Sequence, residues 1–459
     1  MQIKSIFVIL LCIGLYTPYR IVPIVKQISS NDVCFHNNTQ PRLLIKWPTR
    51  SRPDLFFKNL KRFYHHLSHK IPVHFVISCD IDDKTMNCPK SINKFKQFPN
   101  LSYYFGNNNG KISACNADVD KHIDDFDIIL LASDDMYPVT KGFDLVIAEN
   151  MQKFFPTGNG VLNFYDGHAG EEIITYSIMD NKYYRQFGFL YNPVYKSLCS
   201  DNEFTAIAKL LQKERYVHQT LLEHRHPAWG GNDATKMDEL YRHNDSFHDE
   251  DKVTFWTRRD HNFYMQTSQI KWSILIPTLD SRKKTFSSLL TQLEQQIQKN
   301  CLEDKIEIVF FRDNTDLSVG TKRNALVADC TGEYISFIDD DDKISEDYIE
   351  IIYKAILNNP DCVSLTGHYF VNNKFDKPFI HSIKYKKYSD DKKAYYRPPN
   401  HLNPIKKSIA CKFAFPELSY AEDTPWAMQI CNSGLLKKEI KIKKPYYFYY
   451  FNSKKKLKA

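Results

Sequence analysis

Short hydrophobic runs recur along the chain, and each run ends at polar or acidic residues. In the first half these runs cover residues 43–45, 73–77 and 128–131. Between the first two runs, the apolar side chains of residues 55–67 fall at the spacing of an amphipathic helix. Strands that alternate with helices in this way predict βαβ units and a largely parallel sheet.

The second half repeats this order. A hydrophobic run at residues 273–276 is followed by a helical pattern at 286–298 and by further runs at 306–311 and 334–338. Because the same sequence of elements returns with acidic ends at similar distances, we expect an internal duplication.

Short motifs support the duplication. A Pro-Thr pair ends the first run of each half, beginning at Pro48 and at Pro277. An Asn-Ala pair precedes the third run of each half, beginning at Asn116 and at Asn324. We therefore expect an α/β fold with two tandem Rossmann-like domains, each a mostly parallel central sheet flanked by helices.

Length and composition agree with two domains. The chain has 459 residues, of which 42% are hydrophobic and 25% are charged, as in globular proteins of several domains. We place the first domain at residues 42–265 and the second at residues 270–450. A polar linker is expected over residues 26–41, and a basic tail over residues 451–459.

The N-terminus carries an apolar segment at residues 6–16, preceded by Lys4. This pattern predicts a signal peptide or signal anchor over residues 1–25. No small-residue cleavage site follows, which favours an uncleaved anchor and contact with a membrane. The alternative is an ordered or peripheral amphipathic segment.

The net charge and the cysteine content limit the kinds of ligand and structural site that this chain is expected to have. The net charge of +8 suits acidic partners such as phosphates, nucleotides or anionic membranes. The basic residues are dispersed and no reader motif is present, so nucleic-acid binding is not expected. The eleven cysteines form no CxxC pairs, which argues against a zinc site or a disulfide scaffold.

Four consecutive aspartates, residues 339–342, directly follow the hydrophobic run 334–338. In open α/β sheets, ligands bind at the carboxyl ends of the strands. Carboxylates there supply hard oxygen ligands for Mg²⁺ or Mn²⁺, and such an ion can hold a diphosphate. An acidic run by itself is also typical of a solvated loop.

Further motifs in the second half stand in a fixed order around this acidic cluster. They are Ile274-Leu275-Ile276-Pro277-Thr278, Asp313, Gly320-Thr321-Lys322-Arg323-Asn324-Ala325, His401-Leu402-Asn403-Pro404-Ile405 and Tyr420-Ala421-Glu422-Asp423. Together they resemble the family 2 nucleotide-sugar glycosyltransferases, which have the GT-A fold.

The resemblance implies roles for individual residues. A divalent ion, Mn²⁺ or Mg²⁺, would act as Lewis acid beside the departing diphosphate, and its expected ligands are Asp339, Asp341 and Asp342. Asp423 is the expected base for the acceptor hydroxyl, with Glu422 supporting it. The expected nucleotide contacts are Pro277, Thr278, Asp313, Lys322 and Arg323. Attack opposite the leaving group implies inversion at the anomeric carbon.

The first half resembles a more divergent GT-A-like domain. Its expected nucleotide contacts are Pro48, Arg50 and Asp80. Its expected metal ligands are Asp134 and Asp135, with Ser133 at the place of Asp340, and His226 completing the shell. Asp201 matches the place of Asp423, with Glu203 as its rival. The alternative for the histidines is a phosphate contact or an ordinary loop.

These expectations describe a bifunctional glycosyltransferase that moves sugars from nucleotide-sugar donors, UDP-linked, to hydroxyls of a growing glycan. One alternative has a single active domain and a degenerate domain that binds carbohydrate or acts as a scaffold. A nucleotidyltransferase would need a glycine- and lysine-rich phosphate loop, which neither Pro-Thr segment provides. A glycoside hydrolase would use paired carboxylates without a nucleotide pocket, and a non-catalytic carbohydrate-binding protein would not need the acidic motifs.

Overall fold

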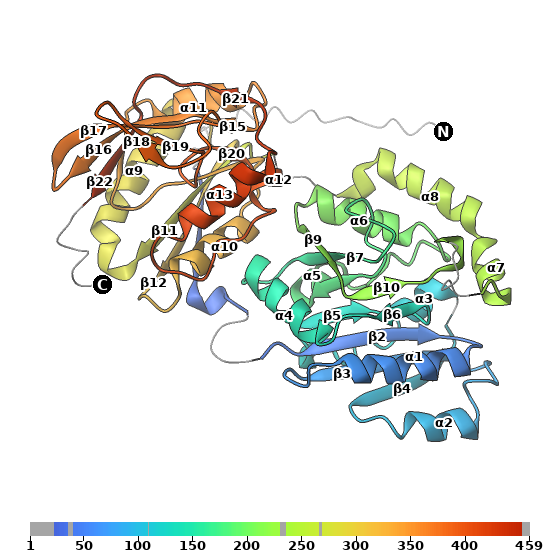
Figure 1. Cartoon of the computed structure of the whole chain (residues 1–459). Helices are drawn as coiled ribbons and strands as arrows, with labels where there is room; N and C mark the ends of the chain where they lie inside the picture. The colour runs from blue at the N-terminus through green and yellow to red at the C-terminus, as the bar shows by residue number, and fades with distance from the viewer. Residues whose placement is uncertain (1–22, 35–39, 109, 230–235, 266–268, 452–459) are drawn as a thin grey trace, which may run out of the picture.

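The computed structural model describes residues 23–34, 40–108, 110–229, 236–265 and 269–451. They form two α/β lobes, coloured blue to green and yellow to red in Figure 1. We call residues 40–265 the first half and residues 269–451 the second half. The predicted α/β fold with two tandem domains is confirmed.

Within the described residues, the central sheet of the first half has seven strands. Their order is β4 (Leu101–Gly106), β3 (Val73–Asp80), β2 (Leu43–Thr49), β5 (Ile128–Leu131), β8 (Ile178–Asp180), β7 (Val161–Tyr165) and β9 (Glu214–Thr220). Every neighbouring pair is parallel except for β8, which is antiparallel to both β5 and β7. A small antiparallel pair, β6 (Met136–Pro138) and β10 (Leu222–His224), adjoins the end of β5.

Helices cover both faces of this sheet. Successive strand residues point to opposite faces, so Leu43 and Ile45 join the core under α1 and α4, whereas Leu44 joins the core under α3, α5 and α6. The helices of the first half are α1 (Pro53–His66), α2 (Pro89–Phe95), α3 (Lys111–Asn116), α4 (Phe143–Phe154), α5 (Asn181–Phe187), α6 (Ser200–Leu210), α7 (Glu239–Asp245) and α8 (His248–Asp260).

The central sheet of the second half also has seven strands in the described part of the chain. Their order is β1 (Ile24–Ser29), β12 (Ile306–Asp313), β11 (Trp272–Leu279), β13 (Tyr334–Phe337), β20 (Ile405–Lys406), β15 (Cys362–Val363) and β21 (Glu439–Ile440). The helices are α9 (Lys283–Lys299), α10 (Val319–Asp329), α11 (Tyr348–Ile356), α12 (Lys407–Ala410) and α13 (Asp423–Ser433).

A second sheet adjoins this one. Its order is β14 (Lys343–Ile344), β22 (Tyr447–Phe451), β16 (Leu365–Val371), β17 (Lys374–His381), β19 (Tyr395–Arg397) and β18 (Ser389–Asp390). Short 3₁₀ helices are η1 (Ser30–Asp32), η2 (Ile123–Asp125), η3 (Pro227–Trp229), η4 (Asn262–Tyr264) and η5 (Asp280–Arg282).

The two central sheets have the same topology, position by position. In each sheet four parallel strands are followed by one antiparallel strand and then by a parallel pair. The small antiparallel pair next to the fourth strand of each sheet order is repeated as well, as β6 with β10 and as β14 with β22. This agreement supports the internal duplication that the sequence predicts.

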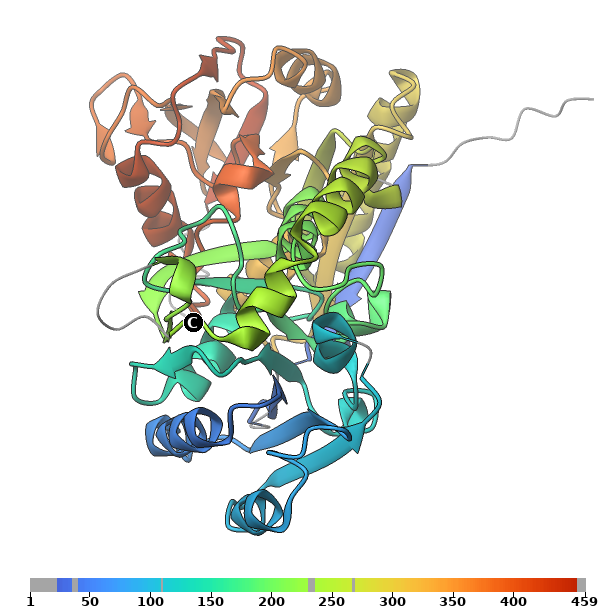
Figure 2. The same ribbon diagram turned by 90° about the vertical axis from the view of Figure 1, so that its right-hand side faces the viewer.

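The edge strand differs between the halves. β4 comes from within the first half, but its position in the second sheet is taken by β1, which precedes the first half in the chain. Figure 2 shows this blue strand beside the strands of the second half. The expected linker over residues 26–41 is therefore wrong in part, because Ile24–Ser29 pairs in parallel with β12.

One buried side chain attaches β1 to the second half. Ile28 is 1% exposed and packs in the core beneath α10, whereas Ile24 is 46% exposed. We expect Ile28→Ala to lower the free energy of unfolding by about 2–5 kcal/mol, as for other buried isoleucines. Ile24→Ala should change it by less than about 0.5 kcal/mol. Urea unfolding compares the two variants, and equal effects would contradict this role of β1.

Polar contacts also join the halves. Lys412 forms an ion pair with Glu171 across them. The Nζ atom of Lys213 donates a hydrogen bond of 2.5 Å to the carbonyl oxygen of Ala328, at the end of α10. Burial and the nearby Lys407 lower the pKa of Lys213 to about 7. A buried lysine therefore lies behind the helix that carries Arg323.

This lysine predicts a pH dependence. Above pH 7 the folded protein releases a proton that the unfolded chain retains up to about pH 10.4, so stability rises with pH across this window. The expected contribution is about 1 kcal/mol per pH unit. Lys213→Met should remove that part of the rise between pH 7 and 9.5 in urea unfolding. If the free energy of unfolding depends on pH in the same way for wild type and Lys213→Met, Lys213 is not the source of the rise.

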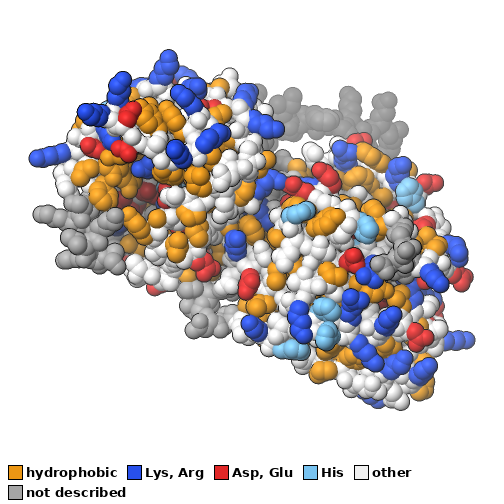
Figure 3. Space-filling model, in the orientation of Figure 1, with side chains coloured by type: hydrophobic (Ala, Val, Ile, Leu, Met, Phe, Trp, Pro, Cys, Tyr) orange, Lys and Arg blue, Asp and Glu red, His pale blue; other side chains and the backbone are white. Residues whose placement is uncertain are grey.

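The predicted N-terminal anchor lies almost wholly outside the described residues, as does the basic tail after Phe451. Among the helices that the structure describes, none has the length and apolar character to cross a membrane. On the face visible in Figure 3, Lys and Arg side chains are spread over both halves.

Candidate active site

The acidic cluster of the second half lies in the loop between β13 and β14, at the carboxyl end of the parallel strands. Asp340 is tied to the end of β11, because Thr278 Oγ1 donates to it over 2.6 Å. Arg282 Nη1 donates to the other carboxylate oxygen over 2.6 Å and also lies 3.2 Å from Asp341. Thr278, an expected nucleotide contact, therefore lies directly beside the acidic cluster.

Arg323 connects two acidic motifs that are far apart in the sequence. From α10 its guanidinium donates through Nη2 to Asp339 and through Nε to Glu422, both over 2.9 Å. The side chain is 4% exposed and its charge lies 4.8 Å from the ring centre of Phe337. Arg323 is thus a buried cation that joins β13 to α13.

His401 forms a second connection. Its Nε2 atom lies 3.6 Å from Asp339 and its Nδ1 atom lies 3.4 Å from Asp423. Burial and Arg323 lower the pKa of His401, but the two carboxylates outweigh them and raise it overall. The two carboxylates therefore favour the protonated form of this ring, which lies between the acidic cluster and the start of α13.

Asp423 is the first residue of α13, where the helix dipole favours an anion. Burial raises its pKa, but hydrogen bonding and charge from His401 outweigh burial and lower the pKa to about 2. The carboxylate is therefore ionised at neutral pH and can accept a proton. Asp423, the expected base, is thus linked to the acidic cluster through His401.

Asp342 differs from its neighbours. Its carboxylate accepts hydrogen bonds from Tyr447 Oη over 2.9 Å and from the backbone N–H of Tyr450 over 3.0 Å. Burial raises its pKa well above the ordinary value, and Asp339 and Asp341 add to this. Asp342 therefore faces β22, whereas Asp339 and Asp341 lie on the side of Arg323 and Arg282.

Two of the expected nucleotide contacts, Lys322 and Asp313, have local partners. Lys322 and Asp313 form a buried ion pair with each other. Asp313 also accepts hydrogen bonds from the backbone N–H groups of Thr315 and Leu317. These contacts hold the turn between β12 and α10, directly beside the end of β11, where Pro277 precedes Thr278.

The first half repeats the contact of the first strand with the acidic pair. Thr49 Oγ1 donates to Asp134 over 3.0 Å, as Thr278 does to Asp340, and Trp47 Nε1 donates to Asp134 over 2.9 Å. Burial raises the pKa of Asp134 to about 7.

This shared contact corrects the sequence comparison of the two acidic motifs. Asp134 matches Asp340, so Ser133 stands at the place of Asp339 and not of Asp340. The register of β5 against β2 agrees, because Leu131 pairs with Lys46 as Phe337 pairs with Leu275.

Asn116 and Asn324 are also equivalent. Asn324 exchanges side-chain hydrogen bonds with the backbone of Phe415, and Asn116 does the same with the backbone of Tyr191. The residue before each asparagine differs, since Arg323 is matched by Cys115. The first half has Ser133 at the place of Asp339 and Cys115 at the place of Arg323. It therefore lacks an equivalent of the buried Asp339–Arg323 ion pair.

A histidine again lies between two carboxylates in the first half. His224 Nε2 is 3.5 Å from Asp135, and its Nδ1 is 3.7 Å from Asp166. Burial lowers the pKa of His224, but both aspartates outweigh it and raise the pKa to about 9. Tyr241 Oη donates to Asp135 over 2.7 Å.

His226, the residue expected to complete the metal shell, follows His224 by two residues, and its ring lies beside Tyr241. Its ring centre is 5.7 Å from that of His224 and 5.0 Å from that of Tyr241. Its Nδ1 atom accepts the backbone N–H of Ala228. His224, and not His226, therefore directly faces Asp135.

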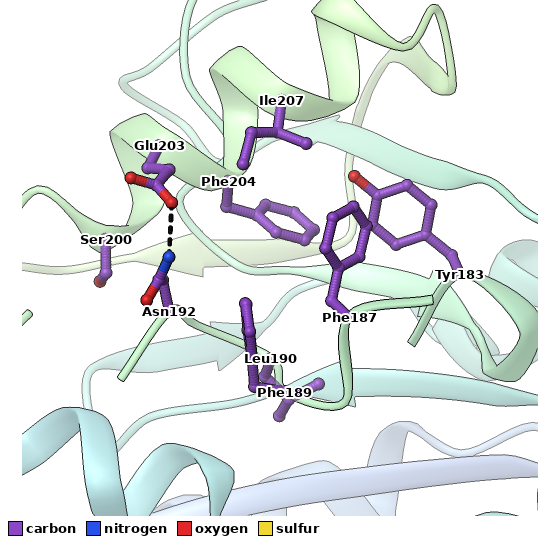
Figure 4. Close-up of a pocket in the computed structure, with 9 residues that line it drawn as sticks. All are labelled: Tyr183, Phe187, Phe189, Leu190, Asn192, Ser200, Glu203, Phe204 and Ile207. Atoms are coloured by element: carbon purple, nitrogen blue, oxygen red, sulfur yellow. Dashed lines mark hydrogen bonds between the residues drawn. The ribbon is translucent and has the colours of Figure 1, made fainter. Parts of the chain in front are cut away.

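Glu203, one of the two expected base positions of the first half, is held by a different set of residues. Glu203 is 1% exposed, and its carboxylate is held by Asn192, Tyr195 and Arg258. It lines a small pocket with Phe204 and other apolar residues (Figure 4). The volume of this pocket is about 20 Å³. These bonds make Glu203 a structural residue.

Asp201 and Arg50 complete the expected set. Asp201 is the second residue of α6 and accepts the backbone N–H of Asn202. Arg50 forms ion pairs of 2.6 Å with Asp80 and Asp82, and Pro48 lies just before it in β2. The expected contact Asp80 is therefore already paired in this structure.

The carboxylates of both halves have the oxygen chemistry that Mg²⁺ and Mn²⁺ prefer. In the described residues no three His, Cys, Asp or Glu side chains are arranged as a metal site. Asp339 and Asp341 are instead neutralised by Arg323, His401 and Arg282. The Arg282 side chain is 36% exposed, so it can move without unburying a core residue.

Residues 273–417 match the family model described as Glycosyl transferase family 2. No curated protein sequence matches the chain.

The similarity to solved structures is weak and covers less than half of this chain. S. aureus TarS, residues 1–349, is 17% identical over 39% of this chain and 60% of its own, with a TM-score of 0.27. The same TarS segment in complex with UDP-GlcNAc gives 16% identity, 40% and 59% coverage and a TM-score of 0.28.

A mannosyltransferase, PcManGT from Pyrobaculum calidifontis in complex with GDP-Man and Mn²⁺, is 12% identical over 42% of this chain and 60% of its own, with a TM-score of 0.33. The chain thus spans about three fifths of the length of these structures. The family match supports the function proposed below.

Proposed function

We propose that the second half, in which residues 273–417 match the Glycosyl transferase family 2 model, transfers a sugar from a UDP-linked donor to a hydroxyl of a glycan acceptor. The observation that carries this proposal is the group formed by Asp339, His401 and Asp423. In this group the ionised Asp423 lies 3.4 Å from His401, which in turn lies 3.6 Å from Asp339 of the acidic cluster.

Each residue has a definite task in this proposal. Asp423 accepts the proton of the attacking hydroxyl. His401 holds the Asp423 carboxylate in place and keeps it ionised. Attack by that hydroxyl on the face opposite the leaving diphosphate inverts the anomeric carbon. Thr278 and Asp313, at the ends of β11 and β12, lie where the nucleoside binds in α/β sheets.

Asp339 and Asp341 are the proposed ligands of Mn²⁺ or Mg²⁺. The ion would supply Lewis-acid stabilisation of the departing diphosphate. Arg282 is the most accessible of the cations that now neutralise the cluster, so we expect it to turn towards the donor phosphates when the ion binds. Asp342, which is held by β22, would support the loop.

We further propose that the first half is a second transferase domain, which makes the protein bifunctional. The repeated Thr49–Asp134 contact and the Asp135–His224–Asp166 group support this. Ser133 in place of Asp339 favours the alternative, a domain that binds carbohydrate without turnover.

We also propose that the N-terminal segment attaches the protein to a membrane. Fractionation of the full-length chain tests this.

Release of nucleoside diphosphate from a panel of nucleotide sugars tests both activities. We expect release that needs an acceptor and falls by at least about 100-fold when EDTA removes the metal ion, with recovery on adding Mn²⁺. Asp134→Asn with Asp135→Asn should abolish transfer from one donor and leave transfer from the other. If that double variant leaves all transfer unchanged, the first half is not an active transferase.

A further inference from the structure

One face of the six-stranded sheet carries a row of tyrosines that runs outward from the acidic cluster. At its inner end, Tyr447 Oη accepts the backbone N–H of Asp339 and donates to Asp342. Side chains directly opposite one another in paired strands point to the same face. Tyr369 in β16 is opposite Tyr449 in β22, and these two belong to the same face as Tyr447. We call Tyr369, Tyr395, Tyr449 and Arg397 the tyrosine face.

The rings of this face are close enough to form one platform. The ring centres of Tyr369 and Tyr449 are 5.2 Å apart and nearly parallel, and those of Tyr369 and Tyr395 are 5.1 Å apart. All three side chains are partly exposed. Tyr449 is close enough to Asp339 and Asp342 for their charges, after burial, to raise its pKa. The platform therefore begins beside the proposed reaction centre.

Arg397 lies on the same face of β19 as Tyr395 and is opposite His381 of β17. Its guanidinium is 5.4 Å from the ring centre of Tyr388. Within the described residues it forms no ion pair, in contrast to Arg282 and Arg323, which are both held by carboxylates. A planar, permanently charged fork with no acidic partner is suited to bind an anionic group of a ligand in two-point geometry.

Tyr388 joins Arg397 to the proposed base. Its hydroxyl is buried without a well-formed hydrogen bond. It lies close enough to Asp423 that burial and the Asp423 charge raise its pKa to about 12, while Arg397 acts in the opposite sense. Asp423 and Arg397 thus flank one tyrosine. The tyrosine face therefore adjoins Asp423, the proposed base that receives the proton of the acceptor hydroxyl.

We infer that the tyrosine face is the acceptor subsite of the second half and that Arg397 selects an acceptor sugar with an anionic substituent, a carboxylate or a phosphate. The inference rests on the proposed function, since it names the acceptor class of that site. The aromatic rings support the apolar faces of the sugar rings, and the few polar groups fix their orientation. Arg397 is then a binding residue whose loss weakens acceptor binding more than turnover.

The experiment compares Arg397→Gln with Arg397→Lys and with Lys393→Gln. Lys393 is an exposed cation of the same region and serves as a matched loss of charge. Three tetrasaccharides act as probes. The first contains glucuronate, and the second is the same tetrasaccharide with its carboxyl groups reduced to alcohols. The third is built from uncharged sugars and carries one phosphate ester. Saturation-transfer NMR measures binding, and nucleoside diphosphate release measures KM and kcat.

Wild type is expected to prefer one anionic probe over the reduced one, and the preferred probe shows whether carboxylate or phosphate is the recognised group. Arg397→Gln should raise KM for that probe by about 10-fold or more and leave KM for the reduced probe within about two-fold. Arg397→Lys should recover part of the loss, because it keeps the charge without the fork.

Equal binding of anionic and reduced probes, or equal effects of Arg397→Gln and Lys393→Gln, would overturn the inference. The proposed function fails in a different way. Probe binding that depends on Arg397, without release of nucleoside diphosphate from any donor, would remove the transferase activity but keep the anionic subsite.

Discussion

Replacing Asp423 by asparagine is expected to lower the rate of sugar transfer by about 10²- to 10⁴-fold, the usual range for loss of a general base. Asparagine keeps the shape of the side chain and its place at the start of α13 but cannot take up a proton. Because Asp423 lies on the far side of His401 from the acidic cluster, donor binding should change little. Stopped-assay kinetics for transfer and calorimetry for UDP binding measure the two quantities.

Asp304→Asn is the control for this variant. Asp304 is an exposed aspartate of the same half, and its ion pair in the described part of the chain is with the neighbouring Lys305. Its replacement should leave transfer within about two-fold of wild type. Transfer by Asp423→Asn at the wild-type rate would show that another group removes the proton.

The largest expected loss of stability comes from Arg323→Met. Arg323 and Glu422 are both buried, and Asp339 accepts from the same guanidinium. Removing the cation leaves two carboxylates without their main partner in a low-dielectric site. Breaking buried pairs in this way costs about 3–5 kcal/mol. Urea unfolding of the second half should show a loss of that size.

The matched comparison is Lys354→Gln, which removes an exposed ion pair with Glu350 within α11. Pairs of this kind contribute about 0.3–0.5 kcal/mol, so the unfolding midpoint should shift little. If Arg323→Met shifts the midpoint no more than Lys354→Gln does, the ion pairs of Arg323 do not hold the site together.

Part of this arrangement could be predicted from the sequence. Strand runs that end at Thr278, Asp313 and the acidic cluster meet at one sheet edge, because parallel strands share their carboxyl ends. The contact of Thr278 with Asp340 follows from this rule, as does that of Thr49 with Asp134.

Other parts depend on tertiary contacts that a local pattern does not encode. Only Ile28 of β1 is fully buried, so residues 24–29 lack the hydrophobic alternation that indicates a strand. His401 and His224 each acquire two carboxylate partners from separate loops. Glu203 resembles a base by position, but its bonds to Arg258, Asn192 and Tyr195 come from residues far from any acidic motif.

For the acidic motifs, too, the sequence alone does not determine which residues of the two halves correspond. From letters alone, Ser133 can be matched to Asp339 or to Asp340, and only the strand register decides for Asp339. Lys322 and Arg323 have the charge to bind phosphate, but folding places Asp313 beside the first, and Asp339 with Glu422 beside the second.

Diffraction from crystals grown with UDP and Mn²⁺ tests the central claim most directly, since Mn²⁺ can be located by its anomalous signal. We predict a Mn²⁺ peak within bonding distance of Asp339 or Asp341, with the uridine over the ends of β11 and β12 and Asp423 facing the open side of the diphosphate. Nucleotide and Mn²⁺ bound away from residues 339–342, with Asp423 turned from them, would contradict it.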